Sequence, residues 1–258
     1  MTSHSQPLAL MFHGIVGKKT TVPEWREVGA ELYDVPREKF VHMMEYLHQS
    51  HYHVTTDCSA SSSSNRSVIL TFDDGEMNNF TEAFPVLRTM GFQAYFFVIA
   101  KRVGKEGYMG YDELRKLDEA GMIIGSHGLT HAILTNLTAT QIEEELVASK
   151  RTLERNLNIP VDCLSIPRGF CNNQVLQIAH RAGYKAVFIS DKSDQLEYPC
   201  LGRVAVKGHW SQKRFACALE GSASFTEQLS EATRSTLKLI LRESGYNALR
   251  NFYLKVFK

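Results

Sequence analysis

Short apolar segments alternate with amphipathic segments along most of the chain. Seven of the apolar segments are hydrophobic on both faces, as buried parallel strands are, and we predict strands at residues 8–12, 68–72, 93–99, 122–125, 162–166, 185–190 and 203–206. In the intervening segments the apolar residues recur at helical spacing, which predicts helices at residues 36–49, 81–90, 111–120, 138–157 and 172–182.

This alternation predicts parallel βαβ units that close, or nearly close, into an α/β fold: a deformed (β/α) barrel of about seven parallel strands. We assign residues 1–220 to the barrel and residues 221–258 to an appended C-terminal helical extension. The end of this extension, residues 246–258, interleaves basic and apolar residues. Such a helix can make peripheral contact with an anionic membrane, but packing against the barrel is the favoured interpretation.

Composition excludes several classes of partner. The 258 residues carry 29 basic and 28 acidic side chains, so no strong net field attracts nucleic acid. No apolar stretch reaches the ~18 residues that a transmembrane segment requires, and the N-terminus lacks the basic start of a signal peptide. The five cysteines form no CxxC pair and no even-numbered framework, which indicates reduced thiols. We therefore expect a cytoplasmic protein.

Two adjacent carboxylates follow the second predicted strand, in the segment Val-Ile-Leu-Thr-Phe-Asp-Asp-Gly that ends at Gly75. Active sites of barrels form where strands end at their carboxyl side. Asp73 and Asp74 would repel each other there unless a cation or a division of roles separates them. Consecutive residues point in different directions, so one carboxylate can hold a metal while the other faces substrate. The alternative, favoured by Asp-Asp-Gly alone, is a pair of helix N-caps.

Two histidines follow another predicted strand, in the segment Met-Ile-Ile-Gly-Ser-His-Gly-Leu-Thr-His that ends at His131. Gly128 argues against a regular helix here, so we expect a tight loop that carries His127 and His131 on one side. Two imidazoles, one carboxylate and an open water position form a common catalytic zinc site. The alternative is two loop histidines that are hydrogen-bonded to the backbone.

Together these segments resemble the NodB-type polysaccharide deacetylases, carbohydrate esterase family 4. The first motif of that family, T-F-D-D-G, matches residues 71–75, and its second, H-x-x-x-H, matches residues 127–131. The resemblance implies the NodB homology fold, with Asp73 as catalytic base and with Asp74, His127 and His131 as ligands of Zn²⁺ or of another divalent transition metal such as Co²⁺ or Ni²⁺. It also implies an N-acetylated sugar or glycan precursor as partner.

The third family motif, R-x-P-x-G, is matched only in part. Pro167 and Gly169 agree with it, but the family's arginine aligns with Ser165, as in a branch with Y-P-x-G-x-x-N. One alternative is that Arg168 replaces the charge of the missing arginine. It lies at a neighbouring position and would point elsewhere on an extended strand, so a surface or rim arginine is the favoured interpretation. We expect this turn to contact substrate, with the N–H of Phe170 donating to the oxyanion.

The remaining motifs leave two assignments open. Asp191 is a candidate for the fourth motif, although a polar loop is the favoured interpretation. The general acid is either His209, from a weak match to the fifth motif, or His13, in a segment that resembles the L-x-Y-H-x-V opening of a circularly permuted subgroup. Because His13 follows a predicted buried strand directly, we predict that it is the acid.

The resulting functional prediction is a metal-dependent hydrolase that removes the N-acetyl group from an amino sugar. A cytoplasmic enzyme cannot readily reach finished cell wall, so we expect a precursor in surface polysaccharide biosynthesis. Two alternatives remain from the sequence. The same site can hydrolyse a non-sugar amide or a cyclic ureide, or the chain can be an inactive carbohydrate-binding homologue, since three motifs are imperfect.

Overall fold

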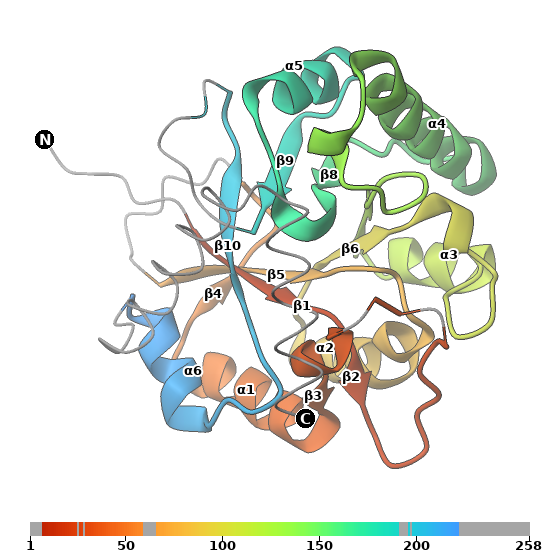
Figure 1. The fold of residues 1–258 in the computed structure, drawn as a ribbon. Coiled ribbons are helices and arrows are strands. Elements are labelled where there is room, and N and C mark those ends of the chain that lie inside the picture. Colours follow the sequence, from red (N-terminus) through yellow and green to blue (C-terminus); the bar gives the residue numbers. More distant parts are fainter. Residues whose placement is uncertain are drawn as a thin grey trace, which may run out of the picture.

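A closed barrel of parallel strands forms the centre of the computed structural model, which describes residues 7–24, 26–27, 29–58, 66–190, 196 and 198–221. Figure 1 shows the strands surrounded by helices. Each strand pairs with the next and the seventh pairs with the first, in the order β1 (Leu8–Phe12), β10 (Leu201–Ala205), β9 (Ala186–Ile189), β8 (Cys163–Ser165), β7 (Ile123–Ser126), β6 (Tyr95–Val98) and β5 (Ser67–Phe72). The predicted seven-stranded barrel is confirmed.

Five predicted helices flank the barrel: α1 (Arg37–Gln49), α2 (Phe84–Met90), α3 (Tyr111–Glu119), α4 (Ala139–Leu157) and α5 (Asn173–Arg181). The sequence marks two of their starts, because the side chains of Thr138 and Asn172 cap α4 and α5 by accepting hydrogen bonds from backbone N–H groups in the first turn. The predicted helix at residues 81–90 is instead divided, since a π-helical turn (Asn79–Ala83) precedes α2.

Several short elements were not predicted. Strand β4 (His53–Val54) extends the sheet beside β5, while β2 (Ile15–Val16) and β3 (Val35–Pro36) form a separate two-stranded parallel pair. Helix α6 (Gln212–Leu219) follows the last barrel strand and packs against α1. The strands β2, β3 and β4 contain only two residues each, which is too few for an alternating pattern to distinguish a strand from a loop.

Strand alternation divides the side chains of β1 and β5 between two environments. Leu10, Phe12, Leu70 and Phe72 belong to the large core that the helices cover. The intervening residues face the barrel interior, where a separate apolar cluster consists of Ala9, Ile69, Tyr95, Phe97, Phe188 and Leu201. The same alternation directs Thr71 and Asp73 inward, above this cluster. The barrel is therefore closed by packed side chains below the position where its carboxyl-end loops converge.

Part of the predicted organisation lies outside the described residues. The structure describes only the first residue of the predicted extension at residues 221–258, and Asp191 is also outside. The domain boundary, the membrane contact and the role of Asp191 therefore stay predictions. Among the helices of the described part of the chain, none is both long enough and apolar enough to cross a membrane.

Candidate active site

The two adjacent aspartates separate at the end of β5. Asp73 continues the inward face of the strand and is 2% exposed, whereas Asp74 and Gly75 adopt positive φ angles of 73° and 75°. Such angles are rare for a residue with a side chain, and they occur where the surrounding structure enforces them, often at functional sites. A Cβ at position 75 would lie 2.8 Å from Cγ1 of Val98, so this turn requires glycine. An oxygen of each carboxylate still lies near Nε2 of His127, at 3.8 Å for Asp73 and 3.6 Å for Asp74.

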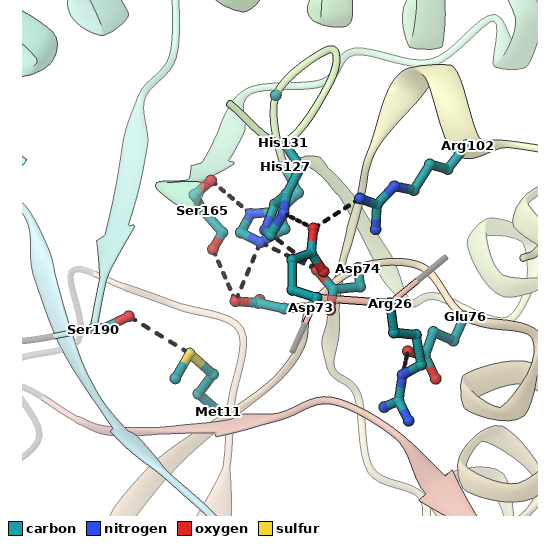
Figure 2. Close-up of polar contacts among 12 residues, drawn as sticks. Met11, Arg26, Asp73, Asp74, Glu76, Arg102, His127, His131, Ser165 and Ser190 are labelled. Atoms are coloured by element: carbon teal, nitrogen blue, oxygen red, sulfur yellow. Dashed lines mark hydrogen bonds and ion pairs between the residues drawn. The ribbon is translucent and has the colours of Figure 1, made fainter. Parts of the chain in front are cut away.

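His127 and His131 lie side by side and face the two aspartates (Figure 2). Nδ1 of His127 lies 2.8 Å from the carbonyl oxygen of Ser165, and Nδ1 of His131 lies 2.7 Å from a carboxylate oxygen of Glu27. The opposite nitrogen of each ring, Nε2, is directed at Oδ1 of Asp74, at 3.6 Å from His127 and 3.5 Å from His131. The predicted tight loop therefore brings both imidazoles to one carboxylate.

Glu145 holds the loop that carries the histidines. Its carboxylate accepts hydrogen bonds from the backbone N–H groups of Leu129 and Thr130, both at 3.0 Å, and from the hydroxyl of Thr130 at 2.6 Å. Glu145 is 8% exposed and lies on the buried stripe of α4, next to Leu146. An acid on the mostly apolar stripe of a helix requires a partner, and that was the signal in the sequence by which this residue could have been found.

The cluster of Asp74, His127 and His131 has the properties of a metal site. One ligand atom from each residue lies within 4.8 Å of the others. Oδ1 of Asp74 is buried and accepts no hydrogen bond from the described residues, which is costly for a carboxylate oxygen without a cation. Burial lowers the pKa of His127 to about 4, against the opposing charge of Asp73, so its imidazole is neutral near pH 7. One carboxylate and two imidazoles suit Zn²⁺ or a similar divalent ion.

Asp73 forms a buried bidentate ion pair with Arg203 of β10. Nη1 of Arg203 lies 2.7 Å from Oδ1 of Asp73, and Nη2 lies 2.8 Å from Oδ2. Ser165 donates a hydrogen bond of 3.1 Å to Asp73 and accepts one of 2.7 Å from Arg203. Although burial alone would raise the pKa of Asp73, the charge of Arg203 holds that pKa well below its usual range.

Arg203 was missed as a site residue. It begins the predicted strand at residues 203–206 and is 4% exposed, with its guanidinium 5.6 Å from the ring centre of Phe97 and 5.9 Å from that of Phe188. A charged residue in an apolar barrel strand needs a buried partner, so the signal was present, but the sequence does not say which partner. Ser165, at the position of the family's arginine, contacts the arginine that β10 supplies.

The turn after β8 lies beside this cluster. Pro167, Arg168 and Gly169 form a 3₁₀ turn in which Arg168 has a φ of 61°. A Cβ on Gly128 would lie 3.4 Å from Pro167, so the turn adjoins the histidine loop. Asp73 takes its charged hydrogen bonds from Arg203 and not from Arg168. Contact of the turn and of Phe170 with substrate stays a prediction.

The two candidate acids occupy different environments. His13 follows β1 and is partly buried. It is close enough to Asp73 that, after Arg203 and His127, a charge on its imidazole would also lower the pKa of that carboxyl. Its ring centre lies 4.9 Å from that of Tyr33, and its Nδ1 is buried without a hydrogen-bond partner in the described residues. His209 is exposed. His13 is therefore in electrostatic contact with Asp73.

The chain is similar to known polysaccharide deacetylases. Residues 60–187 match the family model described as polysaccharide deacetylase. The chain is 29% identical over 197 residues to "Putative polysaccharide deacetylase YxkH" of Bacillus subtilis, covering 72% of this chain and 70% of that protein. It is 27% identical over 143 residues to a peptidoglycan-N-acetylglucosamine deacetylase of Bacillus cereus, covering 55% of this chain and 65% of that protein.

A solved structure supports the fold. The deacetylase PplD of Streptococcus pyogenes, determined in complex with acetate, superposes with a TM-score of 0.72 at 21% identity, covering 83% of this chain and 98% of that one. The family match spans the carboxylate and histidine motifs, whereas His13, Glu27 and Arg203 lie outside it. On the motifs, the barrel and these relatives together, the chain belongs to the polysaccharide deacetylase family and is a sugar N-deacetylase.

Proposed function

We propose that this protein hydrolyses the acetamide of an amino sugar with the help of a divalent metal, Zn²⁺ or a similar ion, that Asp74, His127 and His131 would hold. The observation that carries the proposal is the convergence of two Nε2 atoms on Oδ1 of Asp74, which is buried and receives no hydrogen bond within the part of the chain that the structure describes. A divalent ion bound there supplies Lewis acidity toward a water molecule and toward the acetyl carbonyl.

Asp73 is the general base in this proposal. Its Oδ2 lies 3.8 Å from Nε2 of His127, so it is next to the proposed metal ligands. Asp73 itself accepts hydrogen bonds from Arg203 and Ser165. The bidentate pair fixes the orientation of the carboxylate and keeps it ionised, so that it can take the proton from the attacking water. Arg203 acts through Asp73 and is a positioning residue.

His13 is the proposed general acid. Expulsion of an amine as an anion is prohibitive near neutral pH, so a proton must reach the sugar nitrogen as the C–N bond breaks. His13 lies at the end of β1, next in the barrel to β5, which carries Asp73. Its contact with Tyr33 supports a fixed ring orientation. The N–H of Phe170 is proposed to donate to the oxyanion that develops on the acetyl group.

We propose a precursor in surface polysaccharide biosynthesis as the substrate, on the expectation of a cytoplasmic protein. The relative named as a peptidoglycan-N-acetylglucosamine deacetylase supports an N-acetylated amino sugar as the reacting unit. A nucleotide-linked or lipid-linked amino sugar is the form in which that unit is available before polymerisation.

Acetate release by the zinc-loaded protein tests this proposal. The acetylated substrates are a nucleotide-linked N-acetylamino sugar, an oligomer of N-acetylglucosamine and a simple acetamide. A cyclic ureide, which contains no acetyl group, is followed by the carboxylate that its ring opening produces. We expect acetate from the amino sugars, with the nucleotide-linked form preferred over the oligomer. Preference for the oligomer would overturn the precursor assignment. Turnover of only the acetamide or the ureide, or of no substrate, would overturn the proposed activity.

A further inference from the structure

A carboxylate from the segment between β2 and β3, here called the N-terminal loop, contacts one of the histidines of the proposed metal site. Oε1 of Glu27 lies 2.7 Å from Nδ1 of His131, whose side chain is 6% exposed. The same oxygen accepts a hydrogen bond of 2.8 Å from Nη2 of Arg102, which follows β6. Figure 2 shows Arg102 beside the two histidines. Glu27 is separated from His131 by 104 residues and lies in no helix or strand.

The loop that carries Glu27 is anchored to the barrel by the preceding residue. Arg26 makes a bidentate pair with Asp34, at 2.5 and 2.8 Å, and its Nε lies 2.6 Å from Oε1 of Glu76. Glu76 is 1% exposed and follows the aspartates of β5 by two residues. On the other side, Gly107 packs closely on Pro23: a Cβ built on Gly107 would lie 2.8 Å from Cα of Pro23. The backbone at Glu27 is therefore held at the rim of the site.

We infer that Glu27 is a positioning residue that holds His131 with Nε2 directed at the metal, an inference that rests on the proposed metal site. A histidine that binds a metal through one ring nitrogen usually donates its other N–H to a carboxylate or carbonyl, which fixes the tautomer and raises the basicity of the ligand nitrogen. His127 has such a partner in the carbonyl of Ser165. Glu27 is the corresponding partner of His131.

Arg102 explains how an ionised carboxylate is maintained at this position. Its guanidinium is also 3.0 Å from the hydroxyl of Tyr108, so it is held by a second contact while it binds Glu27. Because Oε1 is shared between Arg102 and His131, the arginine fixes the oxygen to which the imidazole donates. The match to the family model covers residues 60–187, which include His131 but not Glu27. A residue of the N-terminal loop thereby supplies the hydrogen-bond partner of a proposed metal ligand within the matched region.

Zinc affinity, measured by competition with a chromophoric chelator, tests this inference. Loss of such a partner typically costs 10–100-fold in metal affinity, and we expect a loss of this size for Glu27→Ala. Glu27→Gln retains an oxygen that can accept from Nδ1, so it should lose less. Glu24→Ala is the matched control, because it removes the same charge from an exposed position of the same loop and should retain the affinity of the unmodified protein.

The outcomes separate this inference from the proposed metal site. If the unmodified protein binds zinc and Glu27→Ala binds it equally tightly, Glu27 does not position a ligand. An equal loss for Glu24→Ala would attribute the effect to loop charge, and an equal loss for the Gln and Ala variants would overturn the hydrogen-bond mechanism. Failure of the unmodified protein to bind zinc would instead overturn the metal site itself. Unfolding temperatures of all variants control for loss of structure.

Discussion

Asp73 and Arg203, which are 130 residues apart in sequence, form a bidentate ion pair in the interior of the barrel, where they are 2% and 4% exposed. The pair lies above the aromatic layer of the barrel and next to the proposed metal ligands. It combines two functions in one contact, since it neutralises a buried carboxylate and fixes the direction of its lone pairs.

Arg203→Gln should therefore change the pH dependence of the reaction. Without the guanidinium, burial raises the pKa of Asp73. A base that protonates at higher pH loses function at higher pH, so the acid limb of the kcat/KM profile should move upward. Removing one partner of a buried pair also costs roughly 3–5 kcal/mol of stability, which a fall in unfolding temperature would report. Arg168→Gln is the control and should leave the acid limb in place; an unmoved limb in Arg203→Gln would contradict the assignment.

Replacement of Asp73 by asparagine should mainly reduce activity, whereas replacement of Asp74 should mainly reduce zinc binding. Asp73→Asn should retain zinc but lose activity by about 10²–10⁴-fold, the usual contribution of a general base. Asp74→Asn should weaken zinc binding first, because Asp74 supplies the carboxylate ligand. Metal analysis after dialysis, combined with steady-state kinetics, distinguishes the two. Loss of zinc in Asp73→Asn with retention in Asp74→Asn would reverse the roles.

Comparing substrates with different leaving groups distinguishes His13 from His209 as the general acid. His13→Ala should lower kcat strongly on an acetamide and leave the zinc content unchanged. The loss should be smaller on an acetate ester with a good leaving group, because that group departs without a proton. His209→Ala, at an exposed position, should show neither effect. If the His209 variant shows this dependence and the His13 variant does not, the acid is the C-terminal histidine.

A stability prediction follows from the packing of β7. A Cβ on Gly125 would lie 2.4 Å from Cδ1 of Phe97 and 3.1 Å from the carbonyl oxygen of Cys163. Gly125→Ala must displace either an aromatic ring of the barrel interior or the backbone of the neighbouring strand. Overpacking of this kind costs about 1–3 kcal/mol, so thermal unfolding should occur several degrees lower. An unchanged unfolding temperature would show that the barrel interior is packed more loosely than described.

The sequence was most informative where local pattern and chemistry coincide. The strand that ends in Asp73 and Asp74, and the strand that ends in His127, were predictable because buried parallel strands are continuously apolar and their ends are marked by polar residues. The caps at Thr138 and Asn172 were likewise local signals. The family motifs added roles that spacing alone left open.

The contacts that complete the site were not predictable in the same way. Arg203 was visible as a charge in an apolar strand, but pairing it with Asp73 requires the barrel to bring β10 and β5 to either side of β1. Glu27 lies in an irregular segment without any periodic pattern, so no feature of its sequence separates it from the exposed Glu24. Both contacts depend on closure of the sheet, which sets distances between residues more than 100 positions apart.

The central claim is tested most directly by metal removal and restoration. Acetate release from an N-acetylated amino sugar should be measured for the purified protein, after chelation, and after addition of one equivalent of Zn²⁺. We predict that chelation abolishes acetate release and that one equivalent restores it, while the double variant His127→Ala and His131→Ala stays inactive and binds no zinc. Full activity in the chelated protein, or zinc binding by the double variant with the affinity of the unmodified protein, would contradict the account.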